Sequence, residues 1–296
     1  MKKLLSLIIL LMLICFSVQA KEYTSDEVKE CEPLDYTINR LCDLNNVFVT
    51  GKIKSYYENG NLKAEGNFKD GKAEGGAKVY HENGSLKSEI NYKNGKAEGF
   101  ANAYYENGNL KAEENYKDGK LEGVARTYYE NGNLESEVNY KDGKAEGFAN
   151  AYYENGTLKR EENYKDGKLE GLAKGYYENG NLKSEENYKD DKLEGLKKVY
   201  YENGNLLTEA YYKDGKAEGF VKGYYENGNL LVEGNFKDGK QDGLTKFYHE
   251  NGNLVGEINY KNAKAVSGYM YDIYGKRTKM TNAHLHNLTK DLPKEN

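Results

Sequence analysis

The chain has no tryptophan and contains only 2 prolines, 3 cysteines and 4 histidines among 296 residues. The few cysteines and histidines form no zinc-binding motif, and the sequence has no Ser-His-Asp set, Cys-His pair or phosphate-binding loop. His284 and His286 lie in the C-terminal tail, where we expect no metal site. The apolar fraction is 38%, and many of these residues are Tyr and Ala, so we expect no thick core of Leu, Ile and Val.

An excess of positive charge is also absent. The chain has 43 Lys and Arg against 48 Asp and Glu, a formal net charge of −5, and the two signs are interspersed. The sequence therefore shows no basic patch for binding nucleic acid. Glycine and tyrosine are abundant instead, with 33 and 29 residues, and this skew indicates internal repetition.

Residues 104–123, YYENGNLKAEENYKDGKLEG, show the repeated unit most clearly. Between the turn signals Asn107-Gly108 and Asp118-Gly119, apolar and polar residues alternate with a period of two, which predicts a β-strand. Both dipeptides favour type I′ hairpin turns, because their residues tolerate positive φ. The unit is therefore predicted to consist of two strands and two turns.

The Asn-Gly pair recurs at intervals of 24 residues from Asn59 to Asn251, and the second turn recurs at the same interval from Asp70 to Asn262. Nine copies follow one another without an insertion over residues 51–264. A fixed period of this length predicts an array whose units stack on their neighbours. We therefore predict an all-β fold.

The unit G-x-x-K-x-Y-Y-E-N-G-x-L-K-x-E-x-x-Y-K-D-G-K-x-E-G resembles the bacterial variant of the MORN repeat, which also occurs in YwqK-like "antitoxin" proteins. The resemblance covers residues 51–264. It implies an elongated, single-layer, twisted antiparallel sheet of repeated β-hairpins, arranged as a solenoid or meander. It also implies protein interaction, membrane-lipid contact or scaffolding as the function.

Hairpin geometry predicts which residues lie opposite one another. A two-residue Asn-Gly loop gives the pairs Tyr105–Leu110, Ala103–Ala112 and Asn102–Glu113. The same register gives four Lys–Glu pairs, which are Lys174–Glu185, Lys198–Glu209, Lys222–Glu233 and Lys246–Glu257. Across the Asp-Gly turn the predicted pairs are Ala112–Ala125 and Tyr116–Leu121.

These pairs divide the side chains of one unit between two faces of the sheet. The predicted packing face carries Tyr105, Leu110, Ala112, Tyr116, Gly123 and Ala125. The predicted solvated face carries Tyr104, Lys111, Glu113, Asn115, Lys117, Glu122 and Val124. Tyr is enriched at interfaces and also stacks on sugars, so the solvated tyrosines are a candidate binding surface. They are Tyr104, Tyr128, Tyr152, Tyr176, Tyr200 and Tyr224.

The segments outside the array are predicted from their composition. Residues 1–20, with Lys2 and Lys3 before an apolar run, are typical of a cleavable signal peptide, the alternative being an uncleaved anchor. Residues 21–50 are expected to cap the first repeat, with a short helix from Thr24 or Ser25 to Glu32. Cys31 and Cys42 are expected to form a disulfide, the alternative being free thiols. Residues 265–296 are expected to form a degenerate C-terminal cap and a tail that is frayed or briefly helical.

The leading hypothesis for function is an exported, non-catalytic scaffold, periplasmic, secreted or on the cell surface, which binds a protein or cell-surface ligand and mediates adhesion. It needs no cofactor; peripheral membrane contact and the oligomeric state are left open. The alternatives are an antitoxin-like partner protein, as the YwqK label implies, and a carbohydrate-binding module. An enzyme acting on polysaccharide is disfavoured, because every carboxylate recurs many times and none is unique. The repeated acids are expected to serve turn geometry and solubility.

Overall fold

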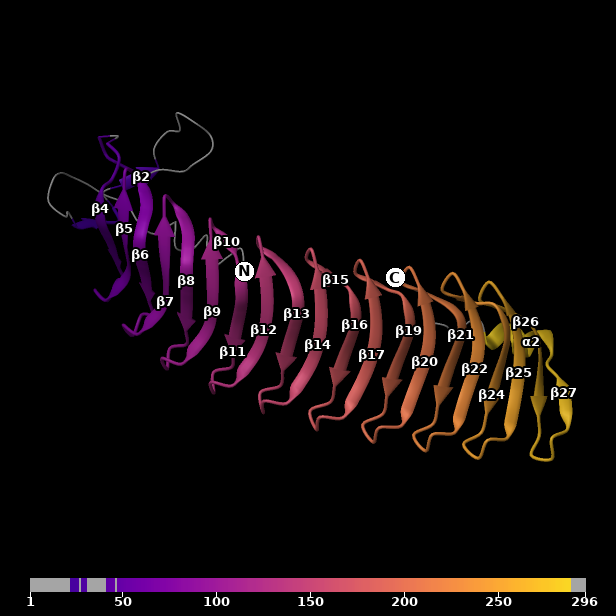
Figure 1. The fold of residues 1–296 in the computed structure, drawn as a ribbon. Helices are drawn as coiled ribbons and strands as arrows, with labels where there is room; N and C mark the ends of the chain where they lie inside the picture. Colours follow the sequence, from indigo (N-terminus) through magenta and orange to yellow (C-terminus); the bar gives the residue numbers. More distant parts are fainter. Residues whose placement is uncertain (1–21, 27, 31–40, 46, 289–296) are drawn as a thin grey trace. The chain divides into compact units, whose positions relative to one another are not determined.

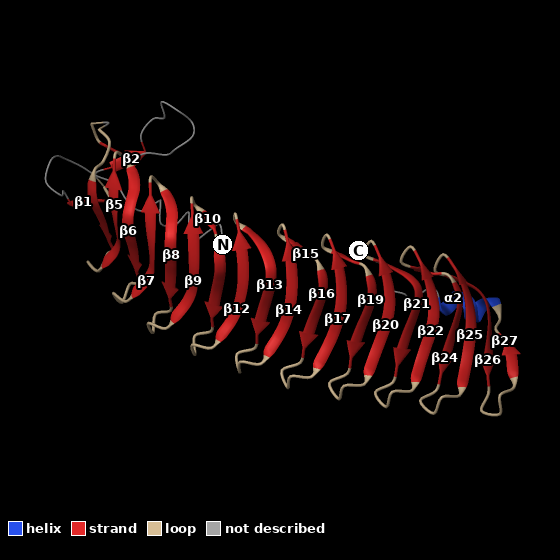
Figure 2. Cartoon of the chain, in the orientation of Figure 1, coloured by secondary structure: helices blue, strands red, loops and turns tan. Residues whose placement is uncertain are grey.

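The computed structural model describes residues 22–26, 28–30, 41–45 and 47–288, and almost all of them lie in strands and turns (Figures 1 and 2). The chain forms two compact units, Met1–Gly147 with Glu154–Gly156, and Phe148–Tyr153 with Thr157–Asn296. We call them the first and the second unit and describe each by itself.

The first unit begins with β1 (Glu22–Thr24), β2 (Val28–Glu30) and β3 (Leu41–Asp43). Its repeat strands are β4 (Gly51–Tyr56), β5 (Leu62–Lys69), β6 (Lys72–Tyr80), β7 (Leu86–Lys93), β8 (Lys96–Tyr104), β9 (Leu110–Lys117), β10 (Lys120–Leu121), β11 (Gly123–Tyr128) and β12 (Leu134–Lys141). Strand β13 (Lys144–Tyr152) is divided between the two units.

The second unit continues the same pattern. Its strands are β14 (Leu158–Lys165), β15 (Lys168–Leu169), β16 (Gly171–Tyr176), β17 (Leu182–Lys189), β18 (Lys192–Leu193), β19 (Gly195–Tyr200), β20 (Leu206–Lys213), β21 (Lys216–Tyr224), β22 (Leu230–Lys237), β23 (Lys240–Gln241), β24 (Gly243–Tyr248), β25 (Leu254–Lys261), β26 (Lys264–Tyr271) and β27 (Arg277–Lys279), followed by helix α2 (Asn282–Leu288). Within each unit, the repeat strands pair antiparallel with their neighbours along the chain. The all-β class and the antiparallel sheet of repeated hairpins are therefore confirmed.

The Asp-Gly turns have the predicted geometry. Asp118 has a φ of 51° and Gly119 a φ of 81°, so both central residues of this two-residue loop are left-handed. That combination defines a type I′ turn, whose twist matches that of the strands it joins. The predicted pair Tyr116–Leu121 is found next to the turn.

The Asn-Gly turns differ from the prediction. Gly108 has a φ of 90°, whereas Asn107 has no positive φ. The Tyr105 N–H donates to the Asn109 carbonyl at 2.9 Å, which leaves a three-residue loop with glycine in the last position. Tyr104, not Tyr105, therefore lies opposite Leu110.

Farther from this loop, the predicted register holds. The pairs Ala103–Ala112 and Asn102–Glu113 are confirmed, as are the four Lys–Glu pairs. The error is confined to the loop, because the extra loop residue is absorbed by a bulge between Ala103 and Tyr104.

A second bulge lies at each Glu-Gly. Leu121 is opposite Tyr116, and Arg126 is opposite Glu113. Between these two pairs, the chain segment that contains the Glu-Gly therefore has two more residues than the strand it faces. Ala112 therefore faces Thr127, and the predicted Ala112–Ala125 pair is wrong. Because this shift is two residues and side chains alternate with a period of two, the bulge itself does not change the faces. The one-residue shift at the Asn-Gly loop does, because it places Leu110 opposite Tyr104, which the prediction had put on the other face.

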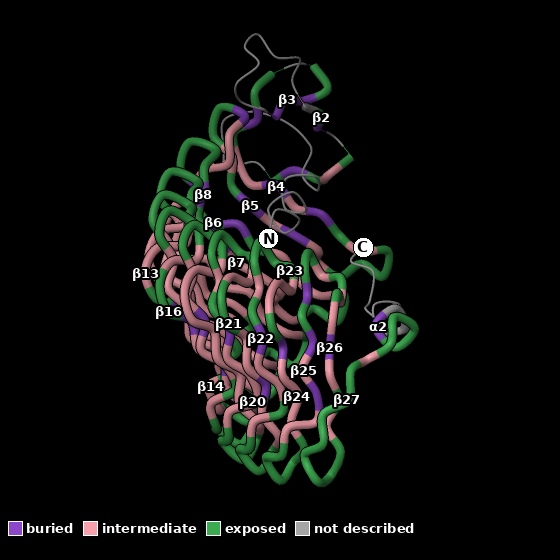
Figure 3. The backbone as a smooth tube through the Cα atoms, turned by 90° about the vertical axis from the view of Figure 1, so that its right-hand side faces the viewer, coloured by how far each residue is buried: buried purple, intermediate pink, exposed green. Residues whose placement is uncertain are grey.

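The packing face is built mainly from small and aromatic side chains. In the first unit, Ala77, Ile90, Tyr92 and Ala97 are buried together, with Tyr116 packed against them. In most of the repeats the strands are half-buried and the turns at their ends are exposed (Figure 3). The thin core agrees with the scarcity of large aliphatic residues in the sequence.

The N-terminal segment covers the first repeat, but not as a helix. Strand β1 pairs in parallel with Lys52–Lys54 of β4, and Tyr23 and Ile53 are buried in one cluster at 3% and 0% exposure. The expected helix is wrong where it falls on described residues, because Thr24 and Val28–Glu30 lie in strands and residues 25–26 in a turn. A strand can satisfy the open N–H and C=O groups along the edge of β4, and a helix cannot. Cys42 is buried and disulfide-bonded. Its predicted partner Cys31 and the predicted signal, residues 1–20, lie outside the described residues.

The C-terminal end of the array is covered by β26, β27 and α2. Leu285 of the helix is buried against Ile258 and Tyr260, and Met280 packs beside them. A short helix is therefore present at 282–288, and residues 289–296 lie outside the described part. No helix among the described residues combines the length and apolarity needed to cross a lipid bilayer.

Candidate interaction surface

A row of alternating charges runs along the predicted solvated face. In the second unit each cation lies opposite a glutamate on both neighbouring strands, as in Glu161, Lys174 and Glu185. We call the series the charged row, which consists of Glu161, Lys174, Glu185, Lys198, Glu209, Lys222, Glu233, Lys246 and Glu257. The Lys174 ammonium lies 3.6 Å from the Glu161 carboxylate. Such partly exposed pairs contribute at most about 1 kcal/mol each, and their main effect is to fix the register.

The predicted tyrosine surface lies beside this row, and its hydroxyls are engaged. The hydroxyl groups donate to glutamates of the neighbouring repeat at 2.6–3.1 Å, in the pairs Tyr104–Glu89, Tyr128–Glu113, Tyr176–Glu161, Tyr200–Glu185 and Tyr224–Glu209. All five tyrosines, and Tyr152 at the end of β13, are half-buried and not fully exposed to water. Burial and the bond to Glu185 raise the pKa of Tyr200 to about 12, so the phenol stays protonated. Ligand binding by these tyrosines stays a prediction.

The second tyrosine of each pair links one Asn-Gly loop to the next. The Tyr105 hydroxyl donates to the carbonyl of Tyr128 at 2.7 Å, and the side-chain amide of Asn109 donates to the carbonyl of Glu130 at 2.8 Å. The ammonium of Lys111 lies 5.2 Å from the centre of the Tyr105 ring. These tyrosines therefore hold the array together.

The repeated acids have a structural role at the opposite edge. The carboxylate of Glu98 accepts the N–H of Asp118 at 2.9 Å, and Lys96 lies 3.4 Å from the Asp118 carboxylate. The same carboxylate-to-turn bond recurs in most of the other repeats. In these repeats the glutamate before the Glu-Gly glycine thus holds the second turn of the following repeat.

A second series on the solvated face was missed by the sequence analysis, apart from Val124. The residue after each Glu-Gly pair, and after Asp242-Gly243 at the equivalent position, is apolar in most repeats and often exposed, with Phe100 at 74% and Val124 at 44% in the first unit. In the second unit the series, which we call the apolar row, is Phe148, Leu172, Leu196, Phe220 and Leu244. Leu172 lies opposite Asn187, so it belongs to the same face as the charged row. The sequence signal is an apolar residue at 24-residue intervals directly after a bulge.

Two members of the apolar row, Leu196 and Phe220, have an aromatic residue between them in place of asparagine. Asparagine separates its members in most repeats, but Tyr211 takes the asparagine position opposite Leu196. On its other side, Tyr211 lies opposite the bulge that ends at Phe220. Leu196, Tyr211 and Phe220 therefore form one patch, which we call the central patch. Tyr211 is 45% exposed and Phe220 41% exposed, and the Lys222 ammonium lies 5.6 Å from the centre of the Phe220 ring.

Among the described residues, no three His, Cys, Asp or Glu side chains are placed to hold a metal ion. The charges of the solvated face are paired along the row, and its carboxylates accept tyrosine hydroxyls. The surface can therefore offer apolar contact with a polar border, which is the arrangement found in many protein interfaces.

Comparison with solved structures gives weak similarities. Two crystal structures of toxin assemblies, TcdB2-TccC3-Cdc42 and TcdB2-TccC3, match at 13% and 14% identity, each with a TM-score of 0.18. A Photorhabdus luminescens Tc holotoxin pore structure matches at 14% identity and the same TM-score. The matches cover 74% of this chain but only 14% of the others, and similarity at this level carries no argument about function. No curated protein matches the chain.

Comparison with protein families gives a match along the array. The model described as "MORN repeat variant" matches nine segments, which are 49–70, 73–94, 101–118, 121–142, 149–166, 169–190, 193–214, 218–238 and 241–262. These segments cover most of the chain and follow the 24-residue period. Repeats of this kind form scaffolds for interaction with proteins or membranes, and the hairpin array of each unit fits that role. The chain belongs to the MORN repeat variant family.

Proposed function

We propose that the protein is an exported, non-catalytic repeat scaffold that binds another protein through the solvated face of its sheet. The observation that carries the proposal is the central patch, where Leu196, Tyr211 and Phe220 are adjacent, whereas asparagine separates the other members of the apolar row. Tyrosine and phenylalanine are enriched in the buried centres of protein interfaces. The array fixes these side chains on paired strands, so little backbone order is lost on binding.

The charge pattern favours a protein over a membrane as the partner. Binding to anionic lipid headgroups requires clustered Lys and Arg residues. In the charged row, Lys198, Lys222 and Lys246 alternate with glutamates, so no cluster of one sign arises. An apolar strip with a neutral border of mixed charges suits a partner that has apolar side chains flanked by polar ones.

Substitution of the central patch tests this function. Tyr211→Asn introduces the residue that occupies this position in most repeats, and Phe220→Ser removes the adjacent ring without entering the packing face. Val266→Ser is the matched control, because Val266 is exposed at 56% but lies outside the patch. Proteins captured from envelope and culture fractions by each variant are then quantified by mass spectrometry.

We expect one partner whose affinity falls by about tenfold or more with Tyr211→Asn and Phe220→Ser, as is usual for central interface residues. The control should retain the partner. Equal capture by all variants, or loss with the control alone, would count against the central patch. Vesicles of anionic lipid that bind the protein equally well after both substitutions would also refute it.

Export is tested separately. Residues 1–20 have the charge and apolar pattern of a signal peptide, so the mature chain should begin at Lys21 and occur in the envelope or the medium. Cell fractionation with N-terminal sequencing measures both. An unprocessed chain in the cytoplasm, bound there to a single protein, would support the antitoxin-like alternative instead. A partner on the surface of another cell would specify adhesion as the role.

A further inference from the structure

The Asn-Gly loops of the second unit are linked by a repeated set of hydrogen bonds. The Tyr225 hydroxyl donates to the carbonyl of Tyr248 at 2.8 Å. The side-chain amides of Asn227 and Asn229 donate to the carbonyl of Glu250 at 3.4 and 2.7 Å. Similar bonds link the preceding loops. The loops that begin at Tyr201 and Tyr225 therefore each present three donors to two main-chain carbonyls of the next loop.

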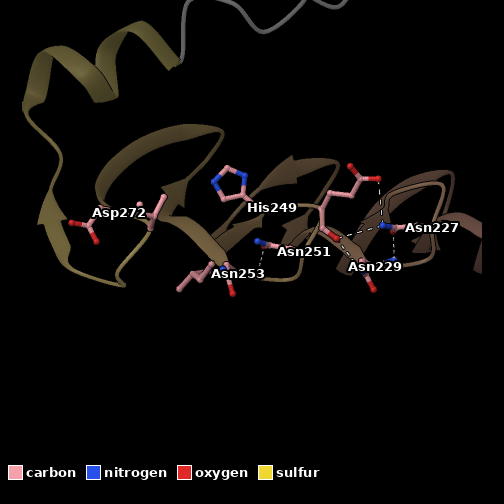
Figure 4. A pocket seen from close by; sticks show the side chains of 9 residues that line it. Asn227, Asn229, His249, Asn251, Asn253 and Asp272 are labelled. Atoms are coloured by element: carbon pink, nitrogen blue, oxygen red, sulfur yellow. Dashed lines mark hydrogen bonds between the residues drawn. The ribbon is translucent and has the colours of Figure 1, made fainter.

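This set of bonds ends at the loop formed by residues 249–253. Within the described part of the chain, the ring of His249 and the side-chain amide nitrogens of Asn251 and Asn253 donate to no protein group, although the Asn251 side-chain oxygen still accepts the N–H of Asn253 at 3.0 Å. The three side chains line an open recess of about 920 Å³, with Asp272 and Ile273 on its other side (Figure 4).

The loop of residues 249–253 has the same main-chain hydrogen bonds as the other Asn-Gly loops. The His249 N–H donates to the Asn253 carbonyl at 2.8 Å, and the Gly252 N–H donates to the His249 carbonyl at 2.8 Å, as in the other repeats. The next loop, residues 272–276, accepts none of the three side-chain donors, and Asp272 stands in it where a tyrosine or histidine begins the earlier loops. The Asp272 carboxylate already accepts the N–H groups of Tyr274 and Lys276 at 3.0 and 2.8 Å.

We propose that this recess binds a hairpin loop of a second copy of the chain, formed by residues 56–61. The donors of His249, Asn251 and Asn253 are those that hold a loop carbonyl pair in the neighbouring repeats, and a Tyr-Glu-Asn-Gly loop is therefore the ligand they fit. Ile273, which lines the recess and is 81% exposed, would be covered by the incoming loop.

The first loop of the array has the complementary groups. In the next loop, the carbonyls of Tyr80 and Glu82 accept bonds from Tyr57 and Asn61. The equivalent carbonyls in the first loop belong to Tyr56 and Glu58, and no repeat loop precedes them among the described residues. Strand β1 pairs with β4 only at Lys52–Lys54, so it ends before this loop. Among the described residues, the first loop thus has acceptors without a loop partner and the loop 249–253 has donors without one, which is the complementarity that a head-to-tail contact between copies requires.

Sedimentation of the full chain over a range of concentrations tests the self-association. The double variant Asn251→Asp with Asn253→Asp keeps the oxygen that caps the loop but removes both amide donors. We expect association in the wild type and a dissociation constant raised about tenfold or more in the variant, because two hydrogen bonds to carbonyls are lost. Asn235→Asp with Asn282→Asp is the charge-matched control, since both asparagines are exposed and lie outside the loop. It should associate like the wild type.

A second measurement identifies the recess without relying on assembly. A cyclised peptide with the sequence of residues 55–63 should shift the NMR signals of the Asn251 and Asn253 side-chain amides, and it should compete with self-association. A protein that stays monomeric at all concentrations would overturn the proposal, even if the peptide binds. Association that is equally strong in the double variant, or peptide shifts confined to other residues, would also overturn it.

Discussion

The turn between Asn262 and Ala263 offers the sharpest test of the backbone geometry. Glycine occupies the second position in seven of the nine turns that recur from Asp70 to Asn262, but alanine occupies it here with a φ of 61°. The alanine N–H still donates to the carbonyl of Gln241 at 2.9 Å. Substitution Ala263→Gly therefore removes the backbone strain and leaves the hydrogen bond in place.

The magnitude follows from two opposing effects. An L-residue in the left-handed region costs about 1–2 kcal/mol, and glycine avoids this cost. Glycine also gives the unfolded chain more freedom, which costs about 0.4–1 kcal/mol. Ala263→Gly should therefore stabilise the last hairpin by about 0.5–1 kcal/mol.

The equivalent turn one repeat earlier provides the reverse experiment. Gly239 has a φ of 81°, and a Cβ added there would meet nothing closer than Lys216 Cβ at 3.9 Å. Gly239→Ala should therefore destabilise its hairpin by a similar amount, about 0.5–1 kcal/mol, through backbone strain alone.

Local stability is the quantity to measure, because a repeat array need not unfold in one step. Native-state hydrogen exchange over residues 230–247 and 254–271 reports the free energy of opening of each hairpin. The two substitutions must move it in opposite directions. A neutral Gly239→Ala, or a destabilising Ala263→Gly, would show that these turns are not held in the left-handed region in solution.

Three further predictions concern the contacts between repeats and the N-terminal cap. Tyr200→Phe removes the 2.8 Å hydrogen bond to Glu185 and should cost about 1 kcal/mol in the same exchange measurement. Because burial and this bond raise the pKa of Tyr200 to about 12, the contribution of the bond to stability should be full below pH 10 and fall as the pH rises toward 12. Burial alone would raise the pKa of Glu186, but hydrogen bonds from Lys197 and Tyr188 lower the pKa below 4.5. The contribution of Glu186 to stability is therefore full above pH 4.5 and is lost as the pH falls through the lowered pKa. Glu186→Gln should flatten this acid dependence in a pH series of thermal melts, and an unchanged profile would contradict the assignment. Reduction of the Cys42 disulfide should lower the stability of the N-terminal cap by about 2–4 kcal/mol, seen as faster exchange at Val49 and Ile53, and unchanged exchange there would show that the cap does not depend on the bond.

Much of the fold could be predicted from the sequence because the period and the turn dipeptides are strong local signals. The Asp-Gly turns and the four Lys–Glu pairs were found as predicted. The Asn-Gly loop was mispredicted because its dipeptide suits two loop types. The loop has three residues because the Asn109 carbonyl accepts the N–H of Tyr105, and the Asn109 amide then reaches Glu130 of the next repeat. A contact between repeats therefore decides a turn that local propensity leaves undecided.

The candidate surface was less predictable for a related reason. The sequence placed Tyr104 and its equivalents on the correct face but could not show that their hydroxyls reach glutamates of the preceding hairpin. The glutamate before each Glu-Gly glycine likewise had no partner that could be named until the following turn was placed beside it. The central patch depends on Tyr211 and Phe220 becoming neighbours across a bulge, which no periodic pattern specifies.

The contacts between repeats also explain where the sequence is free to vary. The Asn-Gly loop bonds and the Glu-to-turn bonds join each repeat to the next, so the residues that make them recur almost unchanged from copy to copy. The position after the Glu-Gly bulge makes no such bond, and it changes between Gly76, Phe100, Val124 and Leu172. Because stacking places no demand on this position, large apolar side chains there are not needed for the fold, and their exposure costs free energy in water. A binding partner that covers them would recover that cost, and this is why the variable, apolar positions, and not the repeated tyrosines and acids, are the residues on which we base the interaction surface.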